Sequence, residues 1–337
     1  MSDRDLVSRT TRWFRKHQRP LPWRANYEPY RIWVSEVMAQ QTRLEVVLAY
    51  FERFVERFPS IDALADASDD EVTGAWSGLG YYRRARMLRD GAREVRDRLG
   101  GRLPSDVGEL LAIPGIGRYT AGAISSIAFQ KRAPIVDGNI ARIVARLFAI
   151  EAPLGSPALM RAAWERAEAL VALSAAPRDF NQGLMEIGAL ICTPRKPACG
   201  TCPLRSDCAA FAEGRVHELP RPKAKPATHA MTIALYVVTR RGRVMMQREP
   251  GALMRGMLHL PHGDTTLLTG EPLHVENATL VGSFRHTVTT RRITFNVYTA
   301  RANGDRRKAE WIAPDELREL PHPSYVRKAL RLAGICK

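Results

Sequence analysis

The chain has 337 residues, 45% of them hydrophobic, and 51 lysines and arginines against 35 acidic residues give it a net charge of +16. This length suits two domains with separate cores, and no stretch approaches the ~18 apolar residues of a transmembrane helix. The charged start lacks the features of a secretory signal, so we expect a cytoplasmic protein that does not bind membranes. The basic excess favours nucleic acid as the partner, although a solubility role or an arginine-rich genome also explains it.

Residues 1 to about 212 predict an almost entirely helical domain. Apolar residues from Leu44 to Phe58 recur at three- and four-residue spacing until Pro59. A second helix, Arg83–Leu99, has a basic outer face, a pattern usually found on solvated helices. Five further helices are expected at residues 106–112, 118–129, 139–149, 157–173 and 178–191.

The pattern changes after the helices. Residues 215–229 are basic and rich in proline, which predicts a semi-rigid linker. Met231–Thr239 and Arg243–Arg248 read as a β-hairpin around Arg240-Arg241-Gly242, and Ile293–Ala300 reads as another strand. Asp315–Leu320 and Tyr325–Leu332 are expected to be helices, so the C-terminal third is a separate α+β domain.

Four of the five cysteines lie close together, at positions 192, 199, 202 and 208. This clustering in a chain without a secretory signal argues for a metal site rather than disulfides. Four thiolates suit either an iron–sulfur cluster or zinc, and only one C-x2-C pair is present. Cys336 is far away in the sequence and reads as a lone thiol.

A glycine-marked turn, Ile113–Ala121, separates two predicted helices. Gly115 and Gly117 allow backbone conformations that other residues resist, and they let the chain approach a ligand closely. The N–H groups at the start of the next helix, near Arg118, are then available to bind phosphate. An ordinary helix–turn–helix corner is the alternative reading.

Two carboxylates stand out. Asp137 precedes a predicted helix and suits the N-cap position. Glu36 is the one acid in an otherwise apolar helix start, with Ile32 and Trp33 one turn before it. Burial beside these residues should raise the pKa of Glu36 and leave it able to donate a proton near pH 7. Taken alone, without further context, it is better read as a partly exposed glutamate.

The cysteine loop and the Pro-Gly-Ile-Gly-Arg-x-Thr-Ala string resemble the endonuclease III superfamily of helix-hairpin-helix DNA glycosylases. The string from Pro29 to Thr42 resembles the MutY-type adenine DNA glycosylases within it. The resemblance implies an all-α glycosylase domain over residues 1–214, with a [4Fe–4S] cluster on the loop 192–208. It also implies that Glu36 protonates adenine at N7, that Asp137 stabilises or attacks the sugar, and that Asn139 helps hold the site.

Further site residues follow from the same resemblance. Tyr119 replaces the lysine that bifunctional relatives use as an amine nucleophile, and a phenol forms no Schiff base, so we expect no efficient strand cleavage. Trp23, Arg24 and Gln182 match the walls of the adenine pocket. Gln41 and Tyr81 match residues that wedge into the base stack during flipping. For Trp23 and Tyr81, core packing is the competing interpretation.

The resemblance is thinner over residues 230–337, which look like the Nudix-like domain that recognises 8-oxoguanine. No Nudix box is present, so a pyrophosphatase is not expected. The Phe-Ser-His turn of the family is replaced by Val288-Thr289-Thr290, and Leu258–Gly263 lacks the usual Trp and Phe. Thr289 and Thr290 are still expected to contact DNA, with weakened discrimination of 8-oxoguanine from guanine.

Taken together, the sequence predicts a monomeric, monofunctional glycosylase of base excision repair at the nucleoid. Its partner would be double-stranded DNA, from which it flips and removes adenine mispaired with 8-oxoguanine or guanine. Two alternatives remain open: a thymine or uracil mismatch glycosylase of the same fold, and a non-catalytic DNA-binding iron–sulfur protein.

Overall fold

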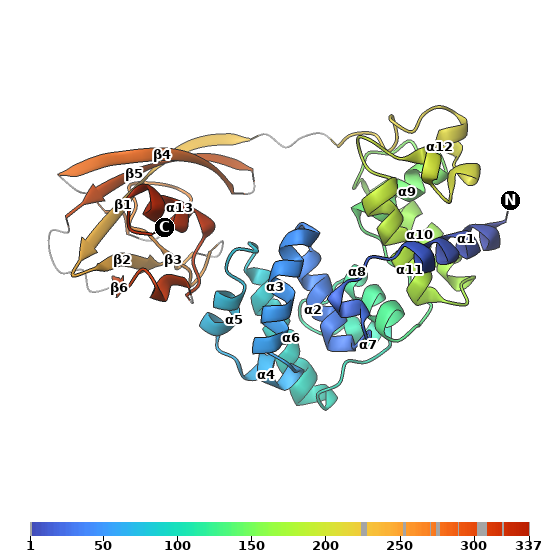
Figure 1. Ribbon diagram of the computed structural model, residues 1–337, viewed down its shortest axis with the longest axis horizontal. Coiled ribbons are helices and arrows are strands. Elements are labelled where there is room, and N and C mark those ends of the chain that lie inside the picture. The colour runs from blue at the N-terminus through green and yellow to red at the C-terminus, as the bar shows by residue number, and fades with distance from the viewer. Residues whose placement is uncertain are drawn as a thin grey trace. The chain divides into compact units, whose positions relative to one another are not determined.

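The computed structural model of the chain (Figure 1) describes residues 2–223, 228–251, 254–269, 271–273, 277–288, 290–301, 309–318 and 320–336. Its contacts form two compact units: Met1–Asp66 with Met87–Ala224, and Ala67–Arg86 with Lys225–Lys337. The domain boundaries expected from the sequence, at 214/215 and 229/230, stay a prediction. Among the described residues, no helix is both long and apolar enough to cross a membrane.

The N-terminal two thirds of the chain is helical, as expected. Polar side chains begin many of the helices: Ser2 and Ser68 form capping boxes, and Glu28, Asp106 and Ser156 accept hydrogen bonds from the first turns. The α-helices of this part are α1 (Asp3–His17), α2 (Pro29–Ala39), α3 (Leu44–Arg57), α4 (Ile61–Asp66), α5 (Asp69–Ala75), α6 (Arg83–Leu99), α7 (Val107–Leu111), α8 (Arg118–Ala123), α9 (Gly138–Leu147), α10 (Pro157–Ala172), α11 (Pro177–Glu186) and α12 (Ala209–Ala212).

Two of the expected helices change their winding before they end. The helix expected at 118–129 is α8 followed by a π-helical turn, η2 (Ile124–Ala128), and the one expected at 178–191 is α11 followed by η3 (Ile187–Ile191). These two segments lie against each other, and Asn181 donates to the Ser126 hydroxyl over 2.8 Å. Wider π turns occur often at functional sites, because they redirect side chains within a helix.

The interior of the helical unit is centred on α2. Ile32, Trp33 and Val34 are 0% exposed there. Gly91 of α6 makes room for this helix, since a Cβ at that position would lie 2.9 Å from the Trp33 ring. Burial of α2 on all sides explains why its sequence is almost continuously apolar, and it places Glu36 inside the core.

The C-terminal part contains a sheet with strand order β3-β2-β1-β5-β4, and β6 (Glu310–Ile312) pairs with β2. The expected hairpin is confirmed as β1 (His229–Arg240) and β2 (Arg243–Arg248), turning at Arg241 and Gly242 with positive φ. The expected strand near 293–300 is β5 (Arg291–Ala300), which runs parallel to β1. Sequence patterns missed β3 (Leu258–His259) and β4 (Ala278–Val288).

Helix α13 (Ser324–Leu332) covers the core of this sheet, where Tyr325 stacks on Phe295 with ring centroids 4.6 Å apart. The helix expected at Asp315–Leu320 is wrong, because the described part of that segment contains only a 3₁₀ turn, η6 (Glu316–Arg318). Pro314 precedes the turn and Pro321 follows Leu320, and a proline disfavours the helical conformation of the residue before it.

Candidate active site

Glu36 lies in the core of the helical unit and is 5% exposed. Burial raises its pKa to about 7, and the charge of Asp137 pushes in the same direction, while a hydrogen bond from Tyr119 and the charge of Arg24 oppose the rise. One of its oxygens, Oε2, has no hydrogen-bond partner among the described residues. A buried carboxylic acid with a pKa near neutrality is suited to donate a proton.

Asp137 caps α9, as expected from the sequence. Its side chain accepts from the backbone N–H of Ile140 over 2.8 Å and from the Asn139 amide over 2.9 Å. Both carboxylate oxygens are therefore held by donors, which fixes the group at the start of the helix. The Asn139 amide thus contacts the Asp137 carboxylate, and its part in the site stays a prediction.

Tyr119 is hydrogen-bonded to one of the two carboxylates and lies within electrostatic range of the other. Its hydroxyl is hydrogen-bonded to Glu36, and burial together with the charges of Glu36 and Asp137 raises its pKa well above the ordinary value. The phenol therefore remains protonated and donates to Glu36. In this position it orients the acid and offers no amine to the sugar.

A chain of hydrogen bonds connects Asp137 to the cysteine loop. The Asn139 amide oxygen accepts from Arg142 over 2.9 Å, and Arg142 also donates to the carbonyls of Cys192 and Gly188 over 2.7 and 2.8 Å. Arg142 is 4% exposed. Sequence reasoning missed this residue, although arginines four positions apart in the apolar segment 140–147 were a usable signal.

The base-pocket residues matched from the sequence also lie together. The Gln182 amide oxygen accepts from Arg24 Nε over 2.7 Å, and Arg24 donates to Glu186 over 2.7 Å. Trp23 is 6% exposed and contacts the edge of Phe51, so core packing accounts for most of its surface. Glu186, which is 1% exposed, was also missed by sequence reasoning.

The glycine turn before α8 has the geometry expected of a tight hairpin. Gly115 has a φ of +84°, and a Cβ there would lie 2.9 Å from Met87 Cβ, so only glycine fits without strain. Gly117 is the N-cap of α8, and a Cβ there would meet no heavy atom within 4 Å. The first N–H groups of α8 are therefore approachable by a phosphate.

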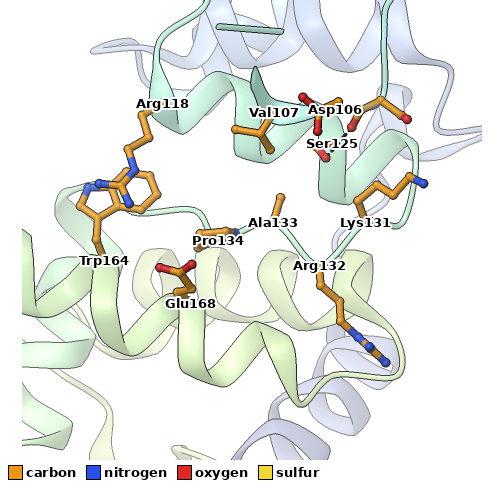
Figure 2. Close-up of a pocket in the computed structure, with 11 residues that line it drawn as sticks. Asp106, Val107, Arg118, Ser125, Lys131, Arg132, Ala133, Pro134, Trp164 and Glu168 are labelled. Carbon is orange, nitrogen blue, oxygen red and sulfur yellow. Dashed lines mark hydrogen bonds between the residues drawn. The ribbon is translucent and has the colours of Figure 1, made fainter. Parts of the chain in front are cut away.

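Arg118 stacks on Trp164, with the guanidinium carbon 3.9 Å from the ring centroid (Figure 2). This pair forms one wall of a cavity of about 450 Å³, whose other walls include Lys131, Arg132 and Glu168. Stacking holds the arginine beside the hairpin, where its charge adds to that of the helix N-terminus. The cavity itself has both signs of charge, and neither Glu36 nor Asp137 lines it.

The two residues matched to the base-stack wedge share one backbone feature. Gln41 has a φ of 56° and Tyr81 a φ of 48°, a conformation that non-glycine residues rarely adopt. Tyr81 is 52% exposed, so core packing does not explain it. Arg84 donates to the Leu79 and Gly80 carbonyls and lies over the Tyr81 ring, which holds this loop in place. Strained, exposed side chains of this kind are typical of functional sites.

The turn between β4 and β5 is described only in part. Thr289 lies outside the described residues. Thr290 is half-buried, and its carbonyl accepts from the backbone N–H of His229 over 3.0 Å. Its role in DNA contact stays a prediction.

None of the four cysteines of the loop forms a disulfide among the described residues. Arg146 donates to Cys192 Sγ over 3.3 Å and to the carbonyls of Thr193 and Pro194. Burial, followed by the charges of the three other cysteines, raises the pKa of the Cys202 thiol to about 11. The four sulfur atoms thus lie within electrostatic range of one another, and the thiolate donor set fits an iron–sulfur cluster.

Comparisons with known proteins agree with this arrangement. Residues 34–169 match the HhH-GPD superfamily of base excision DNA repair proteins, residues 192–208 match the iron-sulfur binding domain of endonuclease III, and residues 233–332 match a NUDIX domain. The cysteine loop is therefore an iron–sulfur site, and the C-terminal domain is Nudix-like.

Several similar curated proteins are described as adenine DNA glycosylases. The adenine DNA glycosylase of Rattus norvegicus is 44% identical over 229 residues, which are 64% of this chain and 43% of that protein. That of Homo sapiens is 45% identical over 59% of this chain and 38% of its own length, and that of Mycobacterium tuberculosis is 40% identical over 60% and 66%. This chain spans less than half of the two mammalian relatives.

Among solved structures, a thermostable thymine-DNA glycosylase is 30% identical with a TM-score of 0.56, covering 63% of this chain and 97% of that chain. An endonuclease III–DNA complex, at 20% identity and a TM-score of 0.52, covers 64% of this chain and 98% of its own and supports the fold of the helical part.

Proposed function

Since the chain belongs to the HhH-GPD superfamily of base excision DNA repair proteins, we propose that it removes adenine from a mispair in double-stranded DNA by hydrolysing the N-glycosidic bond. The observation that carries the proposal is Glu36, a buried acid with a pKa of about 7 that is hydrogen-bonded to Tyr119 and lies within electrostatic range of a second carboxylate, Asp137. The adenine DNA glycosylases that match the chain support the choice of base.

The mechanism follows from what each group can do. Glu36, protonated near neutrality, donates its proton to the flipped adenine, which turns a poor leaving group into a good one. The Asp137 carboxylate, held by the Ile140 N–H and by Asn139, stabilises the positive charge that develops on the sugar. Tyr119 keeps Glu36 oriented. Trp23, Arg24 and Gln182 form the walls around the base.

One set of residues is proposed to bind the DNA phosphates, and another set is proposed to contact the base stack. Gly115, Gly117 and Arg118 would grip the backbone of one strand, which positions the duplex without reading its sequence. Gln41 and Tyr81 would occupy the space vacated by the flipped nucleotide. Such a substrate would place the protein at the nucleoid of the cytoplasm, where we expect it to act as a monomer.

The iron–sulfur site is proposed to hold a [4Fe–4S] cluster on Cys192, Cys199, Cys202 and Cys208. The match of residues 192–208 to the iron-sulfur binding domain of endonuclease III supports an iron–sulfur cluster over zinc. The cluster would supply a rigid anchor for the loop. Arg142 and Arg146 tie that loop to α9, and hence to Asp137.

The proposal is tested by measuring base loss from duplexes with one adenine opposite 8-oxoguanine, guanine, cytosine or thymine, read after alkali. We expect loss opposite the two purines, and a decrease of at least ~100-fold in the single-turnover rate for Glu36→Gln and Asp137→Asn. Strand nicking without alkali at the same rate would contradict the monofunctional assignment. No adenine loss from cluster-replete protein would overturn the choice of base.

A thymine mismatch glycosylase is the second candidate, because the similar solved structure of that description aligns over nearly its whole length. Duplexes with thymine or uracil opposite guanine, assayed beside the adenine set, separate the two. We also propose that the replaced turn at 288–290 weakens the preference for 8-oxoguanine over guanine. A large rate advantage for 8-oxoguanine would contradict that.

A further inference from the structure

Glu186 is a buried carboxylate outside the catalytic pair. It is the last residue of α11 and is 1% exposed. Each of its two carboxylate oxygens accepts a hydrogen bond from a different arginine. Oε1 accepts from Arg24 over 2.7 Å, and Oε2 accepts from Arg19 over 2.8 Å. Removing such charges from water costs several kcal/mol, so a buried ion pair of this kind is weak support for stability. The presence of this ion pair in the core is therefore better explained by a role in positioning neighbouring side chains.

The first consequence of the pair is the orientation of Gln182. Arg24 is held at one nitrogen by Glu186 and by the Arg19 carbonyl, and its Nε then donates to Gln182 Oε1 over 2.7 Å. A guanidinium only donates, so the Gln182 oxygen must face Arg24 and its NH₂ must face the other way, towards Tyr27. A glutamine with a fixed amide presents one hydrogen-bonding pattern to a base.

The second consequence is electrostatic. The charged and titratable groups that act on Glu36 come from three elements: Tyr119 on α8, Asp137 at the start of α9, and Arg24 on η1 (Pro22–Arg24). Arg24 is the one cation among them, and it favours the ionised form of Glu36. A general acid must keep its proton until the base arrives, so an unbalanced cation at this position would work against it.

We propose that Glu186 is a positioning residue that anchors and neutralises Arg24, so that the base pocket keeps a fixed Gln182 amide while Glu36 keeps its proton. The proposal rests on the proposed function, in which Glu36 is the acid. Glu186 bonds to Arg24 and Arg19 and is not among the groups that act directly on Glu36, so in this proposal it acts through Arg24.

The test compares Glu186→Gln, which keeps the shape and removes the charge, with Asp179→Asn as the matched control. Asp179 is on the same helix and pairs with Arg15 over 2.7 Å, remote from these groups in the hydrogen-bond network. Single-turnover excision is measured from pH 5.5 to 8.5. In Glu186→Gln, the fall in rate with rising pH should begin about one unit lower than in the unaltered protein. At pH 8 this is a further loss of about tenfold, which largely disappears at pH 5.5.

Thermal unfolding of the cluster-replete full chain gives a readout that needs no activity. Because the folded pKa of Glu36 lies above its unfolded value, the neutral acid contributes stability that is full below about pH 4.5 and lost as pH rises through about 7. The difference in Tm between the unaltered protein and Glu36→Gln reports this window. The same Tm difference can be measured between Glu186→Gln and the double variant with Glu36→Gln. There, its decline with rising pH should end about one pH unit lower.

The proposal would be overturned if the Tm difference declined over the same pH range with and without Glu186→Gln, or if Glu186→Gln lowered the rate by the same factor at every pH. Either result would leave Glu186 with a purely structural role. A shifted window in a protein that excises no adenine would instead support the role of Glu186 and overturn the proposed function. Asp179→Asn should match the unaltered protein in both measurements.

Discussion

The buried polar groups of the helical unit and of the sheet unit are organised differently. In the helical unit, Asp137, Asn139, Arg142 and the Cys192 carbonyl form one continuous hydrogen-bonded chain. In the sheet unit, His259 and His262 bond through Nδ1 to adjacent backbone carbonyls, and His259 Nε2 faces the buried Glu249 carboxylate over 3.7 Å, beyond hydrogen-bond range.

From this difference we expect substitutions of buried polar residues to affect chemistry in the helical unit and stability in the sheet unit. Linked polar groups transmit a displacement at one end to the other, so substitutions there alter the catalytic geometry. Among the described residues, the hydrogen bonds of the two buried histidines go only to neighbouring carbonyls, so we expect substitutions there to act on folding, with a pH dependence at His259. Four predictions follow this contrast, beginning with the largest effect.

The Arg142→Met substitution should lower the rate of base excision by up to ~100-fold. It removes the donor to Asn139 and the link to the cysteine loop while keeping the length of the side chain. Single-turnover excision and the iron content per chain are the measurements. Arg161→Met, on the exposed surface of α10, is the control. Unchanged excision by Arg142→Met would mean that the chain of hydrogen bonds has no part in catalysis.

The pH dependence of excision should follow the protonation of Glu36. With a pKa of about 7, the protonated fraction falls about tenfold between pH 6 and pH 8, so the chemical step should slow by about the same factor. Saturating single-turnover rates across this range measure it. A rate that does not change with pH would mean that protonation of Glu36 does not limit excision. It would also contradict the expectation that buried polar groups of the helical unit control the chemistry.

Gly115→Ala should weaken DNA binding several-fold and lower stability by about 1 kcal/mol or more. The positive φ and the 2.9 Å approach to Met87 make any side chain there unfavourable. Gly117→Ala, with open space around the added Cβ and an ordinary φ, is the matched variant for stability. Binding to an uncleavable duplex and Tm are the measurements; equal Tm values for the two variants would contradict the strain argument.

His259→Leu should leave excision nearly unchanged and reduce the acid sensitivity of folding. Burial lowers the pKa of His259, so the unfolded chain binds the proton more readily, and stability is lost as pH falls below about 6.5. The fall in Tm from pH 8 to pH 5 should therefore be smaller in the variant. A loss of excision comparable to that of Arg142→Met would show that the two regions are not distinct in this respect.

The sequence by itself determined the elements that depend on local physics. The cysteine spacing indicated the cluster site, the Asp137-Gly-Asn string indicated a helix cap, and Arg240-Arg241-Gly242 indicated a hairpin, because each depends on residues close together in the chain. The apolar residues on its own helix left Glu36 open as a partly exposed glutamate, and the resemblance of the string Pro29 to Thr42 to a known family made the buried acid the prediction.

Tertiary structure alone decided the groupings that join distant segments. Glu186 and Arg24 are 162 positions apart, and Arg142 and Cys192 are 50 apart, so no local pattern predicts that they meet. Strand β4 also escaped prediction, because its partly exposed residues form a strand only through pairing with β5. Local sequence sets the conformation of each element, whereas packing between elements decides which buried charges are paired, and thus which of them serve the site.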